Sequence, residues 1–566
     1  MNIIGLAGLC IDASSSLIKN NKVIAAIEEE RLKRVKHISI IQSGGTPKES
    51  LETCLKLGNI NYKDIDHIGY FFQPFREFFS MSLFRFKKSY RSPSTFIYYF
   101  IGYLDNLRRH LALKKILQEK CSKETKFHSF SHHLCHAASV YYPSPFEDAA
   151  ILVIDAISEF ESTSFYHAKG NKIKKILHYN FPNSLGFIYA MITDHLGFKS
   201  NNDEYKVMGL ASYGIPKYYN DLKKVITIKN DGEIILDYSY FNNNFRGKKY
   251  FNQKFINIFG PKREEKDDLK DIHLNIASSI QKLLEEAVIK MLVNLKKLTK
   301  SKNLCLSGGV SLNCKMNGLI LSKKIFDNIH IEPAPHDAGS SLGAALLVKH
   351  QVLKIGEREK NITPYLGVNF SNNQIKSTLD KANINYNFYE DITTKTAELL
   401  SKGMLVAWFQ GRDEWGPRAL GSRSILADPT IKDMKNILNK KIKNREEFRP
   451  FAPSVIAEEA KNYFDLSVSS PFMLYVVPVL ENVKKKIPAV VHVDGTARPQ
   501  TVSKNQNPIF YELLKKFKKE KGVPILINTS FNINKEPNVH SPYDALRCFY
   551  STGLDYLVIG NYLVKK

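Results

Sequence analysis

Two segments of the chain repeat one alternation of apolar and polar residues. Residues 3–30 (IIGLAGLCIDASSSLIKNNKVIAAIEEE) hold three apolar runs, with Asp12 among small polar residues at the first interruption and an Asn-Asn pair at the second. Residues 149–180 follow the same plan, with Asp155 in the place of Asp12 and a Gly-Asn pair at the second interruption. Asn and Gly tolerate the positive φ of tight hairpin turns, so each segment is predicted to form a three-stranded meander with an Asp at its first bend. The repeat predicts two similar α/β lobes that face a cleft, with bend residues that contact phosphates.

Two later segments are predicted to complete this cleft. NLCLSGGVSLNCKMNG (303–318) predicts an apolar strand, a Ser307-Gly308-Gly309 turn and a helix. The glycines let the backbone approach a ligand, and the N–H groups at the start of the helix suit a phosphate. IEPAPHDAGSSLGAAL (331–346) places Asp337 before a helix of small residues. Asp337 is expected to cap this helix, to serve as an oxygen ligand, or to do both.

A second α/β pattern follows a polar stretch at 350–368. TKTAELLSKGMLVAWFQG, from residue 394, predicts a helix and then a buried strand. PILINTSFN (524–532) predicts a strand that enters a polar turn suited to hold a ligand. At 566 residues the chain is long for one domain, and we expect two α/β domains, residues 1–355 and 356–566.

Cationic residues gather in loops of the second predicted domain, beside Gly, Pro and aromatic residues. Converging guanidinium groups are what phosphoryl and carboxyl oxygens require, so the pattern favours an anion site. The alternative is an ordinary charged loop surface, which would not usually intersperse Trp and Phe with the cations. The cations are Arg412, Arg418, Arg423, Lys443, Arg445, Arg449 and Arg498.

A pair of histidines in HHLCH predicts a metal site in the first domain. His132 and His136 are four residues apart, so one helix face presents both imidazoles. Asp155 follows nineteen residues later at the end of an apolar strand, and Asp337 would supply a fourth ligand. Two imidazoles with a carboxylate leave coordination positions open, as in catalytic sites. The alternative is a polar helix face whose histidines are hydrogen-bonded in the core.

The composition is that of a globular protein, with 43% hydrophobic and 24% charged residues. The formal charge of +25 is spread over the whole chain, which weakens the argument for a polyanionic partner. No apolar stretch approaches eighteen residues, and the start lacks a basic segment, so neither a spanning helix nor a signal peptide is expected. Seven Cys residues without a CxxC pair favour reduced thiols in a cytoplasmic protein.

Residues 74–126 form a basic and aromatic insert. Arg76, Arg85, Lys87, Lys88, Arg91, Arg108 and Arg109 alternate there with Phe and Tyr. The insert is interpreted as a solvated helical segment with a buried aromatic face. The alternatives are attraction to a membrane surface and attraction to a polyanionic acceptor.

An ordered series of motifs over nearly the whole length resembles the NodU/CmcH family of O-carbamoyltransferases. The motifs are EEERLKRVKH, HHLCHAAS, YKVMGLASYG, SGGVSLN, PHDAGSSLGAA, GPRALGSRSILADP, IKNREEFRPFAPSV, HVDGTARPQTV and NTSFN. The resemblance implies a Kae1-like N-terminal domain of the actin/hexokinase superfold and a YrdC-like C-terminal domain. It also implies an enzyme that uses ATP and carbamoyl phosphate.

The implied chemistry has two stages. In the YrdC-like domain, carbamoyl phosphate loses phosphate and the carbamate attacks the α-phosphate of ATP, which gives carbamoyl-adenylate. In the Kae1-like domain, the carbamoyl group passes to an acceptor hydroxyl of a sugar, a glycan or a secondary metabolite. Mg2+ is expected with ATP, and Fe2+ or another divalent metal in the N-terminal site.

The resemblance assigns residues to both stages. Carbamoyl-adenylate formation is implied for Arg418, Arg423, Lys443, Arg449, Arg498 and Asn528, with Ser530. The implied metal ligands are His132, His136, Asp155 and Asp337. Contact with the adenylate or its phosphates is expected for Asp12, Lys206, Ser307, Gly308, Gly309 and Asn313, with Glu204 near the cleft.

The chain departs from the family pattern at three places. Ile11 stands where the family commonly has His before the first-bend Asp, so a role of that His is lost or moved. Ala156 replaces a glycine after Asp155, which changes how closely a phosphate approaches. Lys535-Glu536-Pro537-Asn538 stands in place of a usual Gly-Glu-Pro-Ile. The metal quartet and the cation cluster are complete, so an active enzyme is expected.

Two other functions compete with carbamoyl transfer to a small molecule or glycan. Kae1-like and YrdC-like units also make threonylcarbamoyl-adenosine in tRNA, but no RNA-binding module is visible, so nucleic acid is disfavoured as a partner. A non-catalytic nucleotide-binding scaffold with peripheral membrane contact would not need the metal and Arg residues. The sequence does not identify the acceptor or the general base.

Overall fold

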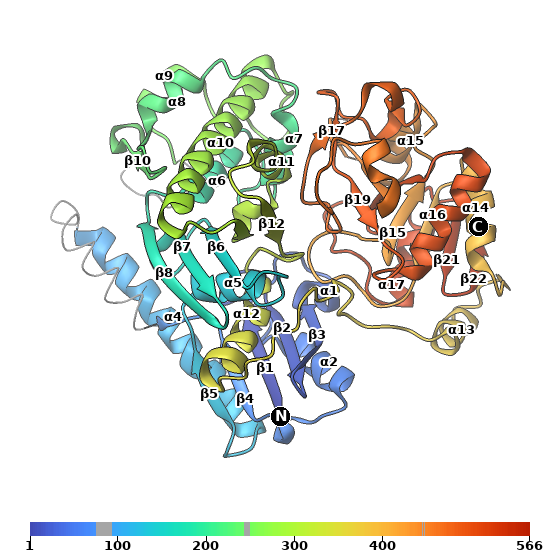
Figure 1. The fold of residues 1–566 in the computed structure, drawn as a ribbon, viewed down its shortest axis with the longest axis horizontal. Helices are drawn as coiled ribbons and strands as arrows, with labels where there is room; N and C mark the ends of the chain where they lie inside the picture. The colour runs from blue at the N-terminus through green and yellow to red at the C-terminus, as the bar shows by residue number, and fades with distance from the viewer. Residues whose placement is uncertain (75–92, 243–249, 444, 447) are drawn as a thin grey trace. The chain divides into compact units, whose positions relative to one another are not determined.

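The computed structural model describes residues 1–74, 93–242, 250–443, 445–446 and 448–566. Within these ranges the chain forms two compact units (Figure 1). The first unit comprises Met1–Glu29 and His37–Ile362, and the second comprises Glu30–Lys36 and Thr363–Lys566. A short segment near the N-terminus therefore packs with the C-terminal part of the chain.

Two five-stranded sheets of the first unit share one plan, which confirms the predicted repeat. The first sheet has the order β3-β2-β1-β4-β5, and the second has the matching order β8-β7-β6-β11-β12. In each, three meander strands pair antiparallel and two further strands add parallel to the first meander strand. This duplicated α/β arrangement is that of the actin/hexokinase superfold. The strands are β1 (Asn2–Ala7), β2 (Ser14–Lys19), β3 (Lys22–Glu28), β4 (His67–Tyr70), β5 (Lys126–Ser129), β6 (Asp148–Ile154), β7 (Glu161–Lys169), β8 (Lys172–Asn180), β11 (Asn303–Ser307) and β12 (Asn328–Ile331).

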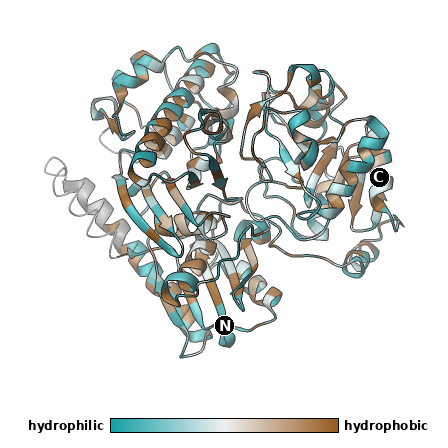
Figure 2. Ribbon diagram, in the orientation of Figure 1, coloured by the Kyte–Doolittle hydropathy of each residue, from teal (hydrophilic) through white to brown (hydrophobic). Residues whose placement is uncertain are grey.

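The turns and apolar runs explain these strands. Asn20 and Asn21 have φ of 51° and 65°, and Gly170 has φ of 58°, as the predicted hairpin turns require. The apolar residues of β1 and β6 are buried because helices cover the sheets. In Figure 2 the strands near the N-terminus are mainly hydrophobic.

Two helices lie between the sheets of the first unit. Helix α12 (Gly339–Leu347) packs on β1, β2 and β4, and α5 (His132–Tyr141) packs on β6 and β11. The two helices also pack against each other (Figure 1). The other helices of this unit are α2 (Lys48–Gly58), α4 (Pro93–Lys120), α6 (Leu185–His195), α7 (Glu204–Leu210), α8 (Tyr219–Val225), α9 (Gln253–Phe259), α10 (Asp271–Thr299) and α11 (Cys314–Lys323), and a small hairpin pairs β9 (Ile226–Ile228) with β10 (Ile234–Leu236).

The second unit is an α/β structure built on an eight-stranded mixed sheet. The predicted helix, glycine and buried strand are α14 (Ile392–Ser401), Gly403 with φ of 80°, and β14 (Val406–Phe409). The sheet order is β13 (Tyr386–Phe388), β22 (Tyr562–Lys565), β21 (Tyr556–Ile559), β14, β15 (Arg423–Ala427), β20 (Ile525–Ser530), β16 (Ala452–Ile456) and β19 (Gln500–Val502). The remaining elements are α1 (Glu29–Lys33), α13 (Asn372–Lys381), α15 (Met434–Leu438), α16 (Pro508–Lys521), α17 (Pro542–Tyr550), β17 (Val477–Pro478) and β18 (Thr496–Ala497).

None of the helices in the described ranges combines the length and the apolar character that a membrane crossing requires. Of the predicted insert 74–126, residues 75–92 lie outside the described ranges, and the rest holds α4 and the start of β5.

Candidate active site

Four side chains of the first unit converge as the sequence predicts for a metal site. His132 Nε2 lies 2.8 Å from His136 Nε2, 3.3 Å from Asp155 Oδ2 and 3.4 Å from Asp337 Oδ1. His136 Nε2 lies 3.3 Å and 3.7 Å from the same two carboxylate oxygens. Donors bound at about 2.1 Å to one ion at tetrahedral angles lie about 3.4 Å apart. The four donors therefore fit a divalent cation.

The electrostatics of this quartet favour a cation. Burial alone would lower the pKa of His132, but the Asp337 and Asp155 carboxylates raise it to about 10. Burial would raise the pKa of Asp155, but the neighbouring imidazoles of His132 and His136 hold it well below its usual range. Asp155 Oδ2 is buried without a hydrogen-bond partner. Two carboxylates beside two imidazoles carry the charge and the donor types that bind a dication.

The residues around the quartet fix its geometry. Ser307 Oγ lies 3.4 Å from His136 Nδ1, the nitrogen that does not face the cluster. Such a contact sets which ring nitrogen is left to bind a metal. Glu159 accepts a hydrogen bond of 3.1 Å from the backbone N–H of His132 and so caps α5, because Ser131 makes no side-chain cap. Sequence reasoning did not assign Glu159, although it closes the second bend.

Asp337 does not cap the helix that follows it. The N-cap residue of α12 is Ala338, whose methyl group cannot accept a hydrogen bond, and the Asp337 carboxylate faces the histidines instead. The carbonyl of Ala338 accepts a hydrogen bond of 2.8 Å from Ser14 Oγ. That bond ties the Asp337 turn to the first bend.

The Gly308-Gly309 turn packs against the second bend. Gly308 has φ of 87°, and a Cβ there would lie 2.2 Å from the Ile154 carbonyl oxygen. A Cβ on Gly309 would lie 3.3 Å from Asp155 Oδ1. Position 308 therefore accepts only glycine. Gly309 places the turn next to Asp155 of the metal quartet.

The predicted ligand residue Asn313 is engaged within the protein. Its side-chain oxygen accepts a hydrogen bond from the Met316 N–H and so caps α11, and its amide donates to Gln281 at 2.9 Å. Asn313 is buried, so it supports the start of α11 rather than offering both polar atoms to a nucleotide.

The first bend contains an imidazole that sequence reasoning missed. His37 Nδ1 lies 2.7 Å from Asp12 Oδ1, and both residues have φ of 54°. The Ala13 N–H donates to the Ile38 carbonyl at 2.8 Å, which holds the segment after His37 against the bend. The side chain of His37 is 34% exposed, whereas that of Asp12 is 8% exposed. The sequence does contain a signal for this residue. His37 is the last residue of the motif EEERLKRVKH, and it supplies a histidine to the first bend, where this chain has Ile11 in place of the family's usual His.

Lys206 and Glu204 lie on α7 near this bend. Lys206 Nζ pairs with Asp203 Oδ2 at 3.1 Å, and Glu204 is largely buried. Burial raises the pKa of Glu204, while the charge of His37 acts in the opposite direction. Both residues therefore neighbour groups of the predicted cleft.

The second unit brings three of the predicted anion-binding cations, and Ser530, to one edge of its sheet. Strand β20 is antiparallel to β15 and to β16, and β19 is parallel to β16. The end of β20 thus meets the beginnings of β15, β16 and β19 at the same edge. Ser530 ends β20, and Arg418, Arg449 and Arg498 lie in the segments that lead into β15, β16 and β19.

The surroundings of these residues differ. Arg498 is half-buried, and among the described residues its guanidinium has no protein partner. Arg449 Nη1 lies 3.4 Å from Glu446 Oε2. Asn528 is buried and donates to Ser454 Oγ and Gln500 Oε1, both at 3.0 Å, while its side-chain oxygen has no hydrogen-bond partner. Lys443 ends a short π-helix (Asn439–Lys443), and its side chain lies outside the described part.

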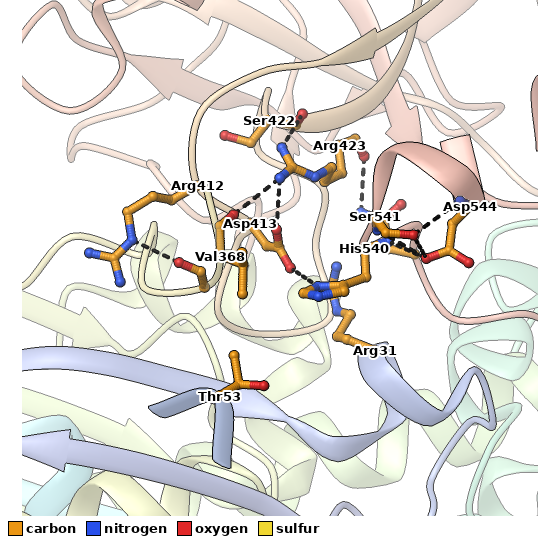
Figure 3. A network of polar contacts seen from close by, with 12 residues as sticks. Arg31, Thr53, Val368, Arg412, Asp413, Ser422, Arg423, His540, Ser541 and Asp544 are labelled. Atoms are coloured by element: carbon orange, nitrogen blue, oxygen red, sulfur yellow. Dashed lines mark hydrogen bonds and ion pairs between the residues drawn. The ribbon is translucent and has the colours of Figure 1, made fainter. Parts of the chain in front are cut away.

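The side chain of Arg423, which the resemblance assigns to carbamoyl-adenylate formation, is enclosed by protein groups. Its side chain is 0% exposed, and its guanidinium donates to the carbonyls of Gln410 and Gly411 and to Asp413 Oδ1 at 2.8 Å. The guanidinium also lies 3.6 Å from the centre of the Phe409 ring. Figure 3 shows the Asp413 carboxylate between Arg423 and His540, whose Nδ1 is 2.6 Å from Asp413 Oδ2. Arg423 therefore supports the start of β15.

Comparison with known proteins finds one family match in each of the two units. The family model described as carbamoyltransferase N-terminus matches residues 2–346, and the one described as carbamoyltransferase C-terminus matches residues 397–566. The protein sll1178 of Synechocystis is 38% identical over 100% of this chain and 97% of its own. Nodulation protein NolNO of Sinorhizobium fredii is 37% identical over 98% of this chain and 79% of its own. Nodulation protein NolO of Bradyrhizobium diazoefficiens is 37% identical over 77% of this chain and 79% of its own.

The chain belongs to the carbamoyltransferase family, and its two family regions include the metal quartet and the cationic sheet edge. It is therefore an enzyme of the transferase class.

Proposed function

We propose that the chain is an ATP-dependent O-carbamoyltransferase that uses carbamoyl phosphate as donor and a hydroxyl of a sugar, glycan or secondary metabolite as acceptor. The observation that carries the proposal is the convergence of His132, His136, Asp155 and Asp337 on one point in a region matched by the carbamoyltransferase family. The cationic sheet edge of the second unit provides the complementary site for phosphates.

The second unit makes the activated donor. Water cleaves carbamoyl phosphate to carbamate and phosphate, and a carbamate oxygen then attacks the α-phosphorus of ATP, which expels pyrophosphate. The guanidinium groups of Arg418, Arg449 and Arg498, with Lys443, stabilise the charge on the phosphoryl oxygens. Asn528 and Ser530 orient the bound groups from β20, and Mg2+ accompanies ATP.

The first unit transfers the carbamoyl group. The acceptor oxygen attacks the carbamoyl carbon, the bond from that carbon to the adenylate oxygen breaks, and AMP leaves. The Gly308-Gly309 turn, Ser307, Lys206 and Asp12 hold the nucleotide. The metal quartet would hold Fe2+ or another divalent ion, which supplies positive charge to the phosphate and to the carbamoyl carbonyl.

We assign His37 as the base that takes the proton from the acceptor hydroxyl. Asp12 accepts its Nδ1–H, which leaves Nε2 as the basic nitrogen. An alcohol is a weak nucleophile, and in many enzymes a neighbouring imidazole activates it by accepting its proton.

The first stage is tested without an acceptor. Purified protein with ATP, carbamoyl phosphate, Mg2+ and Fe2+ is expected to release pyrophosphate and to form carbamoyl-adenylate. Arg498→Ala is expected to lower pyrophosphate release at least 100-fold, because a cation at a phosphoryl transition state contributes on that order. Lys402→Ala, which removes an exposed cation of the same unit, is expected to change nothing.

Two results would overturn the proposal. Absence of pyrophosphate from the wild-type reaction rules out the activation step. Equal activity of Arg498→Ala and Lys402→Ala shows that the sheet edge does not bind the phosphates.

A further inference from the structure

Helix α4 of the first unit has two apolar faces. Its inner face buries His110, Leu113 and Leu117, which are at most 8% exposed. The His110 ring lies 5.2 Å from that of Tyr70 on β4 and 5.8 Å from that of Phe127 on β5. This face packs on the first sheet, as expected for a helix that covers a sheet.

The outer face carries a second stripe. Ile101, Leu104 and Leu111 are 59%, 45% and 54% exposed, and their spacing places them on one side of the helix. Arg108 and Lys115 are exposed on the same side, at helical spacing from the apolar residues. A helix that already buries one face normally presents a polar opposite face. Among the described residues, nothing covers this outer stripe.

The amino-acid composition of the insert around α4 is also basic and aromatic. Residues 74–126 contain twelve Lys and Arg against four Asp and Glu, together with eleven Phe and Tyr. Cations mixed with aromatic and aliphatic residues are the combination that favours the interface of an anionic bilayer. Each cation near such a surface raises the partition coefficient about fivefold.

We propose that the outer face of α4, defined by Ile101, Leu104, Arg108, Leu111 and Lys115, docks on an anionic lipid surface. The apolar side chains enter the headgroup region, and the cations contact lipid phosphates. A polynucleotide would satisfy the cations but not the apolar stripe. A second copy would satisfy the apolar stripe but would bring two strongly basic inserts together. A lipid surface satisfies both.

The test uses the full chain and vesicle sedimentation. Binding is expected to equimolar phosphatidylglycerol–phosphatidylcholine vesicles and not to pure phosphatidylcholine, with a decrease as salt is raised. Leu104→Glu with Leu111→Glu is expected to lower the partition coefficient at least tenfold. Val293→Glu, an exposed apolar position on α10 of the same unit, is the matched control and is expected to bind as wild type. Because all three positions are exposed, circular dichroism is expected to be unchanged.

Several results would overturn the proposal. These are equal sedimentation with both vesicle types, no sedimentation with either, or undiminished binding of the double variant. A dimer that the double variant converts to a monomer would assign the stripe to a second copy. Tight binding of an RNA oligonucleotide with no vesicle binding would assign it to nucleic acid. Pyrophosphate release in the absence of vesicles reports on the proposed enzyme activity separately.

Discussion

Two buried carboxyl groups of the first unit have opposite protonation because the cations beside them offset burial to different degrees. His132 and His136 hold the pKa of Asp155 low, whereas burial raises the pKa of Glu332 to about 8. Glu332 is 2% exposed, its Oε1 has no hydrogen-bond partner, and the charge of His336 offsets only part of the burial. Glu332 is therefore neutral in the folded protein at pH 7.

Glu332→Gln is expected to stabilise the protein at alkaline pH. The folded-state pKa of Glu332 is above its unfolded-state value of 4.5, so its contribution to stability is full below pH 4.5 and is lost as pH rises to about 8. The amide of Gln does not ionise, so the gain over wild type grows across this window to on the order of 4 kcal/mol. Thermal unfolding at pH 5.5 and pH 8.5 measures the difference. The exposed control Glu264→Gln is expected to show no such trend, and an equal gain at both pH values would contradict the assignment.

The second prediction at the scale of single residues concerns the role of His37 in carbamoyl transfer. His37→Ala is expected to leave pyrophosphate release unchanged and to lower carbamoyl transfer to an alcohol such as glycerol about 100-fold. Transfer to hydroxylamine is expected to fall less than tenfold, because this nucleophile is already neutral and reactive near pH 7. AMP release measures both reactions. Equal losses with the two acceptors would mean that His37 only positions the nucleotide.

At the scale of elements, the metal quartet depends on the contact between α5 and α12. Gly343 of α12 meets α5 so closely that a Cβ would lie 1.9 Å from the Cys135 carbonyl oxygen. His132 and His136 lie on α5, and Asp337 precedes α12, so this contact sets their separation. A close helix crossing of this type requires a residue without a side chain.

Gly343→Ala is expected to push the two helices apart. The expected cost is about 1–3 kcal/mol of stability, with a loss of metal affinity of about tenfold or more. Hydrogen exchange of the α5 and α12 segments and metal content after dialysis against Fe2+ measure the two effects. Gly356→Ala is the matched control, because a Cβ there has no neighbour closer than 3.8 Å. Protected helices and full metal content in Gly343→Ala would refute the coupling.

Local patterns were enough to predict the elements, but not the partners of every side chain. The meanders, α5 and β14 follow from apolar periodicity and turn residues, which act within a few positions along the chain. The surroundings of Arg423 were not predicted, because its loop has the composition of a phosphate site and only the fold shows that Asp413 and backbone carbonyls surround it. His37 was missed because its partner Asp12 is twenty-five positions away.

At the scale of the whole molecule, the chain passes between its two units three times, after Glu29, after Lys36 and after Ile362. It leaves the first unit after Glu29, adds Glu30–Lys36 to the second, and returns at His37. The sequence did not predict this crossing, because EEERLKRVKH reads as an ordinary charged helix. The residue at which the chain returns, His37, supplies the imidazole that pairs with Asp12.

Arg34 anchors this segment in the second unit. Its guanidinium donates to the Pro537 carbonyl at 2.9 Å, and it lies 3.7 Å from Glu536 Oε2 and 3.5 Å from Asp544 Oδ1. Burial lowers the pKa of Arg34, and the two carboxylates offset this effect. Removing one member of a buried ion pair leaves the others without compensation.

Arg34→Ala is expected to destabilise the second unit by about 2–4 kcal/mol. The chain has two tryptophans, Trp408 and Trp415, and both are buried in the second unit, so tryptophan fluorescence during urea unfolding reports on that unit alone. Lys402→Ala removes an exposed cation that follows α14 and pairs with Glu398. This variant is expected to change the free energy of unfolding by less than about 1 kcal/mol. If the segment is part of the cooperative structure, only Arg34→Ala moves the midpoint. Coincident midpoints for both variants and wild type would show that Glu30–Lys36 is attached to the second unit without contributing to its stability.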